Sequence, residues 1–206
     1  PKIGGQATSV LDSPLYVRYK QFGTKTGRLT TNKNSFPILS LNKNLRSVIK
    51  PQNDVYVELD FNGAEIRTLL GMLNEVQPKE DVHEFHLRTI FNSSVTREQA
   101  KVHFFSWLYG SREMSQKQEG KELDVRRHHA LNYLDESTTA ELTLKQALKI
   151  DYLLRTQGSG SKIAFLIHDA IVLDLKKDDK HLLPIVFGLM KSTNFGEFGV
   201  NTKLGK

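Results

Sequence analysis

Two carboxylates in the sequence stand at the ends of segments with the pattern of β-strands. Asp60 closes the alternating segment 55–59, and Asp169 lies between the apolar runs 163–167 and 170–175. Carboxylates that converge from separate strands can hold two Mg²⁺ ions about 3.5–4 Å apart for phosphoryl transfer. Mg²⁺ needs few carboxylates when substrate phosphates complete its coordination. Either aspartate by itself also fits an ordinary strand end, where Asp satisfies a turn.

A second set of residues combines positive charge with aromatic rings. Arg97, Lys101, Phe105 and Tyr109 follow one another four positions apart, so on a helix they form one slanted stripe. The basic end coincides with the positive end of the helix dipole and suits a triphosphate. The aromatic end suits stacking on a base. The same spacing also fits an amphipathic surface helix whose aromatic residues lie in the core.

The surrounding pattern predicts the elements that must position these residues. A half-buried strand ends at Asp60, and the two apolar runs around Asp169 predict a β-hairpin with His168 and Asp169 at its turn. Apolar residues at helical spacing predict several helices. Their ranges are 64–73, 81–91, 97–109, 142–154 and 182–190, the last followed by a glycine-rich tail.

Composition limits the class of protein. The chain has 206 residues, with 29 Lys and Arg against 23 Asp and Glu, a formal charge of +6. An excess of this size favours a polyanionic partner. The absence of Cys excludes disulfides, thiolate zinc sites and a cysteine nucleophile. No apolar run approaches the roughly 18 residues that a membrane span needs, so we expect a soluble, intracellular protein.

These segments resemble the motifs of family A DNA polymerases, the bacterial DNA polymerase I family. Residues 96–110 are similar to motif B, R-x3-K-x3-F-x3-Y-G, and residues 60–67 resemble motif A, usually D-Y-S-Q-I-E-L-R. Residues 168–170 resemble motif C, usually H-D-E. Residues 26–29 match the family's T-G-R-L, and residues 81–83 match an acidic-aliphatic-histidine step between motifs A and B. The five matches occur in the family's order.

The resemblance implies roles in binding metal and triphosphate. Asp60 and Asp169 would bind two Mg²⁺ ions, assisted by the backbone carbonyl of Phe61. Arg97 and Lys101 would hold the phosphates of the incoming nucleotide. Lys101 would also protonate the leaving pyrophosphate.

Other matching residues imply contacts with the sugar, the base and the DNA. Phe105 would pack against the nascent base pair, with Tyr109 near the template. Glu65 would be the steric gate that crowds a ribose 2′-OH, its carboxylate held by Tyr109. The implied DNA contacts are Arg28 in the minor groove at the primer end, His168 beside the primer terminus, and Asn132 four residues before the Q-G-T-A-A-like segment 136–140.

The sequence also departs from the family pattern. Ala170 stands where motif C has an acid, and Asp174 or Glu58 is the candidate replacement. Glu136 replaces the Gln of the Q-G-T-A-A segment, and His128 replaces an Arg. A carboxylate at position 136 disfavours contact with DNA phosphates. The segment between motifs B and C is also shorter than the usual fingers.

Together these features predict an α+β protein: a polymerase palm, with an antiparallel sheet backed by helices, and an inserted helical fingers subdomain. The expected parts are 1–74 (palm with motif A), 75–134 (fingers with motif B) and 135–206 (palm with motif C). The expected reaction is attack of a primer 3′-OH on a deoxynucleoside triphosphate, with two Mg²⁺ ions. The expected partners are primer–template DNA and deoxynucleoside triphosphates, with no membrane, and with thumb and exonuclease modules that are separate or upstream.

Two other interpretations stay open. A single-subunit RNA polymerase-like palm would share the motif A aspartate, the basic helix and the His-Asp step, but that family lacks the equivalents of Glu65 and Phe105. A palm that has lost catalysis and only binds primer–template is suggested by Ala170 and Glu136. Against that reading, both aspartates and both basic residues of the stripe are retained.

Overall fold

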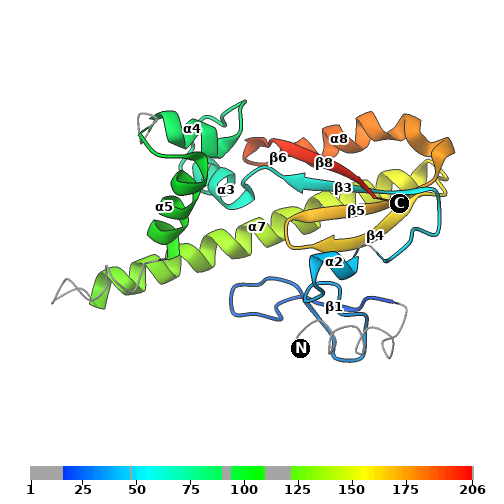
Figure 1. Ribbon diagram of the computed structural model, residues 1–206, viewed down its shortest axis with the longest axis horizontal. Helices are drawn as coiled ribbons and strands as arrows, with labels where there is room; N and C mark the ends of the chain where they lie inside the picture. Colours follow the sequence, from blue (N-terminus) through cyan, green and yellow to red (C-terminus); the bar gives the residue numbers. More distant parts are fainter. Residues whose placement is uncertain (1–15, 47, 90–93, 110–121, 206) are drawn as a thin grey trace.

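The computed structural model describes residues 16–46, 48–89, 94–109 and 122–205, with side chains for all of these except residues 43, 107–109 and 122–132. At its centre is a four-stranded antiparallel sheet in the order β4-β5-β3-β8 (Figure 1). The strands are β3 (Val55–Phe61), β4 (Lys162–Ile167), β5 (Ala170–Leu175) and β8 (Val200–Gly205). The predicted strand before motif A and the predicted hairpin are confirmed.

One face of the sheet packs against two helices. They are α7 (Glu122–Thr156) and α8 (Leu183–Lys191), the latter preceded by the 3-10 turn η1 (Lys177–Leu182). Because side chains alternate along a strand, Val57, Leu59 and Phe61 of β3 all point to this side, and all are buried. They share one core with Ile150 of α7 and Met190 of α8. Burial of this apolar surface fixes the helices on the sheet.

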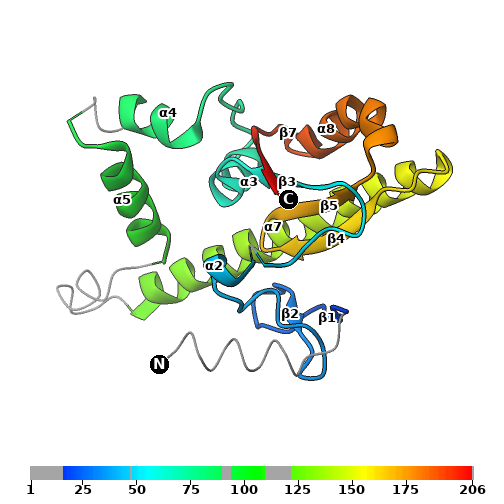
Figure 2. The same ribbon diagram turned by 45° about the vertical axis from the view of Figure 1, so that its right-hand side comes forward.

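The opposite face of the β4–β5 hairpin is covered by the N-terminal segment, which lies below the sheet in Figure 2. This segment contains β1 (Tyr19–Lys20), β2 (Thr30–Thr31) and α2 (Lys43–Arg46). Ile38 packs against Ile167 and Val172. The hydroxyl of Tyr19 accepts a hydrogen bond from the backbone N–H of Leu166 and donates one to its carbonyl. The hairpin is therefore held on both faces, which explains why every residue of β5 is buried.

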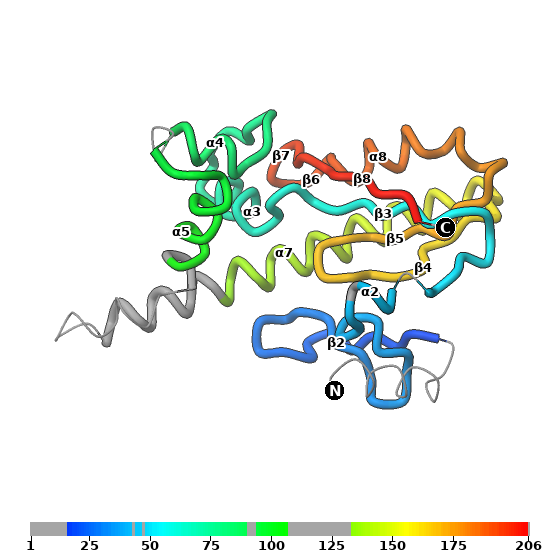
Figure 3. The backbone as a smooth tube through the Cα atoms, viewed as in Figure 1, coloured from blue at the N-terminus to red at the C-terminus, as the bar shows by residue number. Residues whose placement is uncertain are grey.

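The segment between β3 and α7 is helical. It contains α3 (Ala64–Met72), α4 (Val82–Thr89) and α5 (Arg97–Tyr109). The tube in Figure 3 leaves the sheet after β3, passes through these helices and returns to the sheet along α7. The bounds of α5 are those that the sequence predicts, and α3 and α4 fall within their predicted ranges.

Two elements differ from the sequence prediction. The pattern predicts a helix only over 142–154, whereas α7 is one helix of 35 residues. The residues interpreted as a tail form β6 (Ser192–Thr193), β7 (Gly196–Glu197) and β8. Five of the six residues of β8 are exposed. Because this edge strand buries no continuous face, its sequence lacks the apolar alternation that predicts a strand. Its pairing with β3 is seen only in the structure.

The division into palm and fingers segments stays a prediction, and α7 runs without a break through its second boundary at residues 134 and 135. Of the helices in the described ranges, none has both the length and the apolar character that crossing a bilayer requires.

Candidate active site

The register between β3 and β5 brings the two predicted catalytic carboxylates together. Asp60 pairs with Ala170 across the two strands, and Asp169 immediately precedes Ala170. Ile167 also pairs with Ala170, so His168 and Asp169 alone form the turn between β4 and β5. His168 has a φ of +56°, a backbone conformation that side-chain-bearing residues rarely adopt. The tight turn sets Asp169 at the end of the ladder beside Asp60.

The charged forms of both carboxylates are disfavoured. Burial and the negative charge of Asp60 raise the pKa of Asp169 to about 6. Burial also raises the pKa of Asp60, against the opposing effect of the Lys203 ammonium. Two neighbouring carboxylates that repel each other in a partly buried site favour an added cation.

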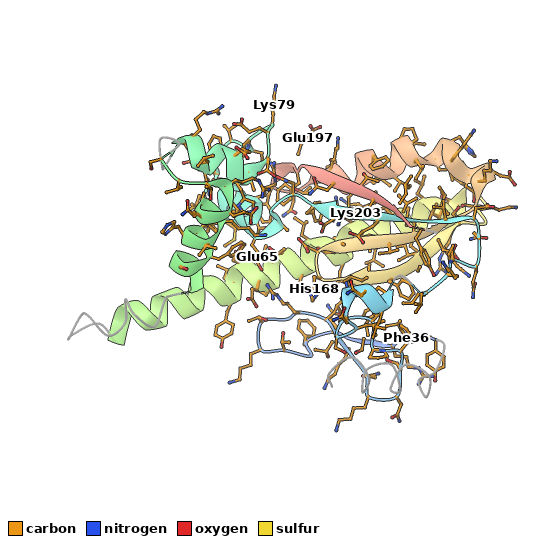
Figure 4. The ribbon with its side chains drawn as sticks, in the orientation of Figure 1. Phe36, Glu65, Lys79, His168, Glu197 and Lys203 are labelled. Atoms are coloured by element: carbon orange, nitrogen blue, oxygen red, sulfur yellow. The ribbon has the colours of Figure 1, made fainter. Side chains whose placement is uncertain are left out.

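The two aspartates open onto a cavity of about 600 Å³ between the sheet, α3, α5 and α7. Figure 4 labels two of its lining residues, Glu65 in the first turn of α3 and His168 at the hairpin turn. Nine of the predicted site residues line this one cavity: Arg28, Asp60, Phe61, Glu65, Arg97, Lys101, Phe105, His168 and Asp169. The two other predicted residues, Tyr109 and Asn132, have side chains outside the described part of the structure.

The basic end of α5 faces the cavity with one of its charges already paired. Arg97 donates to the carboxylate of Asp81, with Nη2 to Oδ2 at 2.8 Å. Asp81 also accepts hydrogen bonds from the backbone N–H groups of His83 and Glu84, so it caps the start of α4. Although burial by itself raises the pKa of Asp81, hydrogen bonds from Arg97 and Asn62 bring it well below its ordinary value. Asp81 therefore orients Arg97 toward the cavity wall.

Phe105, the first aromatic residue of the stripe, packs against a buried histidine. The ring centroids of Phe105 and His83 lie 6.3 Å apart. Burial lowers the pKa of His83 to about 4, so its ring is neutral near pH 7.

Close approach of α4 to the start of α3 depends on Gly63, which has a φ of +63°. A Cβ there would lie 2.2 Å from Cγ1 of Val82, so only glycine fits this position.

Arg28 joins three elements of the cavity wall. Its Nη2 forms an ion pair with Oε1 of Glu65 on α3, and lies 3.4 Å from Oε1 of Glu136 on α7. The sequence resemblance implies that Tyr109 holds Glu65 and that Arg28 contacts the minor groove. Both stay predictions, and the side chain of Tyr109 lies outside the described part of the structure. The pairing of Arg28 with the two glutamates has no local sequence signal, because it depends on how a loop packs on two helices.

Sequence reasoning missed Asp135. This residue is completely buried, and neither carboxylate oxygen has a hydrogen-bond partner among the side chains and backbone that the structure describes. Burial, with the charges of Glu65 and Glu136, raises its pKa to about 8. Its position directly before Glu136 in the sequence gives no sign that the helix buries it.

The candidate replacements for the missing motif C acid have other partners. Asp174 is buried and accepts hydrogen bonds from the backbone N–H groups of Gln52 and Asn53, toward the other end of β5. Glu58 accepts a hydrogen bond from Nζ of Lys203 on β8, at 2.6 Å. Lys203 is a second residue that sequence reasoning missed, because the strand that carries it was interpreted as a tail.

The donor set can be compared with what Mg²⁺ requires. Among the described residues, no group of three or more His, Cys, Asp or Glu side chains is arranged to hold a metal ion. Asp60 and Asp169 supply two carboxylates at the wall of an open cavity, and oxygen donors of this kind suit Mg²⁺ when waters and substrate phosphates complete the coordination. The residues present therefore fit the ions as a shared protein–substrate site.

Comparison with known proteins gives a fold. No family model and no curated protein matches the sequence. Among solved structures, the POL domain of Pol1 from M. smegmatis, in complex with DNA primer-template and dNTP, superposes with a TM-score of 0.79 at 15% sequence identity. The match covers 99% of this chain and 50% of that one, so this chain spans half the length of its structural neighbour. This chain has a mixed α+β architecture, an antiparallel sheet backed by helices, which matches the palm fold of that polymerase domain.

Proposed function

We propose that this chain is the palm and fingers of a template-directed DNA polymerase that extends a primer 3′-OH with deoxynucleotides. The observation that carries the proposal is the single cavity shared by Asp60, Asp169 and the basic end of α5. Negative groups for metal lie at one wall and positive groups for a triphosphate at another. Phosphoryl transfer depends mainly on such positioning and charge neutralisation.

In this proposal each wall has one task. Asp60, Asp169 and the backbone carbonyl of Phe61 would hold the metal ions. Mg²⁺, when bound, supplies the positive charge that activates the attacking oxygen and stabilises the leaving one. Arg97 and Lys101 orient the triphosphate, and Lys101 donates a proton to the leaving pyrophosphate. Phe105 packs on the nascent base pair, and Glu65 excludes a ribose 2′-OH.

Primer extension tests the proposal directly. Purified protein is incubated with a labelled primer–template, Mg²⁺ and the four deoxynucleoside triphosphates. Products should lengthen according to the template and disappear in the Asp60→Asn/Asp169→Asn double variant. A preference for ribonucleotides over deoxynucleotides in this assay would support an RNA polymerase-like palm. Tight primer–template binding without extension by either substrate would support a palm that has lost catalysis.

A further inference from the structure

Arg28 forms ion pairs with two carboxylates at the cavity wall. Glu65 and Glu136 both present Oε1 to the same guanidinium nitrogen, Nη2, from two different helices. The carboxylate side chains are 16% and 11% exposed, so water screens these pairs less than pairs at the surface. Glu65, Arg28 and Glu136 all line the cavity. The side chain of Arg28 is thus a link between α3 and α7.

The loop that carries Arg28 is shaped for this link. The backbone N–H of Arg28 donates to Oγ1 of Thr24, and the N–H of Gly27 donates to the carbonyl of Thr24. Gly27 has a φ of +75°, and a Cβ there would lie 3.5 Å from Cβ of Ser137 on α7. The loop therefore rests on α7 beside Glu136, and the side chain of Arg28 needs little reorganisation to reach both carboxylates.

Two carboxylates share the guanidinium of Arg28. The nearby carboxyl of Asp135 adds little charge near pH 7, because burial raises its pKa to about 8. A neutral amide at position 136 would remove the ion pair that ties Arg28 to α7 and keep the one to Glu65 on α3. The guanidinium would then be anchored less firmly, and so would the carboxylate of Glu65 that pairs with it.

We propose that Glu136 is a positioning residue for sugar selection: it anchors Arg28, and Arg28 fixes the carboxylate of Glu65 at the cavity wall. The inference rests on the proposed function, in which Glu65 meets the sugar of the incoming nucleotide. It also gives a reason for an acid at this position, because a neutral side chain cannot form an ion pair with Arg28. Arg28 serves here as a bridge between α3 and α7.

The test measures kcat/KM for the same base as deoxy- and ribonucleotide. Glu136→Gln should lower the deoxy-over-ribo ratio by about 3- to 10-fold, since loss of a partly buried ion pair loosens Glu65. Glu141→Gln makes the same chemical change on the exposed side of α7 and should leave the ratio unchanged. Arg28→Met should match Glu136→Gln, and the double variant should lose no more than either, because both act through one link.

Each other outcome has a separate meaning. An inactive wild type removes the proposed function, and this inference with it. A ratio that changes in Glu65→Ala but stays within about twofold in Glu136→Gln leaves the proposed function standing and overturns the inference. An unchanged deoxy-over-ribo ratio in Glu65→Ala would show that Glu65 does not select the sugar, and this also overturns the inference. A lower melting temperature in Glu136→Gln with equal loss for both sugars assigns Glu136 a structural role and also overturns it.

Discussion

Asp60 lies directly opposite Ala170 in the antiparallel ladder of β3 and β5. The pairing sets the turn residue Asp169 at the same end of the sheet as Asp60, although the two carboxylates are far apart in the sequence. Ala170 is itself buried, at 6% exposure. Asp60 and Asp169 therefore lie together at the cavity wall.

Asp60→Asn should reduce primer extension by at least about 100-fold, because an amide oxygen is a poor replacement for a charged metal ligand. The affinity for primer–template should change little, since the side chain keeps its size. Extension assays and fluorescence anisotropy measure the two effects. Mg²⁺ should also raise the melting temperature of the wild type and raise that of the variant much less, since the ion relieves repulsion between Asp60 and Asp169.

Asp178→Asn is the matched control for this prediction, because Asp178 is an exposed carboxylate on η1 outside the cavity. It should extend primers and respond to Mg²⁺ as the wild type does. Normal extension by Asp60→Asn would remove Asp60 from the mechanism.

Lys101→Ala should impair nucleotide incorporation far more than duplex binding. Lys101 is exposed at the cavity, one turn along α5 from Arg97, where a triphosphate rather than the duplex would meet it. We expect kcat/KM for the nucleotide to fall by about 10- to 100-fold, as for loss of a charge-assisted contact to phosphate. Lys149→Ala, an exposed lysine on α7, is the control. Weaker binding of the duplex by Lys101→Ala, with unchanged turnover at saturating DNA, would instead assign Lys101 to general phosphate binding.

Glu65→Ala should raise the use of ribonucleotides relative to deoxynucleotides, because it removes bulk from the cavity wall near Asp169. Some loss of overall rate should accompany the change, since the variant also removes one of the ion pairs of Arg28. The measurement is kcat/KM for the same base with each sugar. If the ratio stays constant, the likeness to motif A does not extend from Asp60 to Glu65.

Asp135 should make the stability of the protein depend on pH. Its pKa is about 8 in the folded state and about 3.9 in an unfolded chain. Between these values the folded protein retains a proton that the unfolded chain releases, so the free energy of unfolding should fall as pH rises from about 4 to about 8. Asp135→Asn carries no charge at any pH and should be more stable than the wild type near pH 8, by roughly 1–3 kcal/mol.

Urea denaturation of both proteins at several pH values in this range checks the prediction. Asp151→Asn, on the outer side of α7 and paired with Arg155, serves as the control and should follow the wild type. Parallel pH profiles for the wild type and Asp135→Asn would show that Asp135 is ionised in the folded state.

The sequence by itself determined those elements whose residues carry a local signal. Alternation predicted β3, two apolar runs joined by a polar pair predicted the hairpin, and four-residue spacing predicted α5 with its observed bounds. These signals are local because a strand or helix buries one face at a fixed period. The nine predicted site residues that line the cavity came from the resemblance to the family A motifs rather than from periodicity.

Tertiary structure decided the rest. The exposed strand β8 has no periodic signal, since an edge strand buries little, and its place beside β3 comes from backbone pairing. The link from Arg28 to Glu65 and Glu136, and the burial of Asp135, arise where a loop and two helices meet. Such contacts depend on packing between segments distant in the sequence, and residue spacing within one segment carries no information about them.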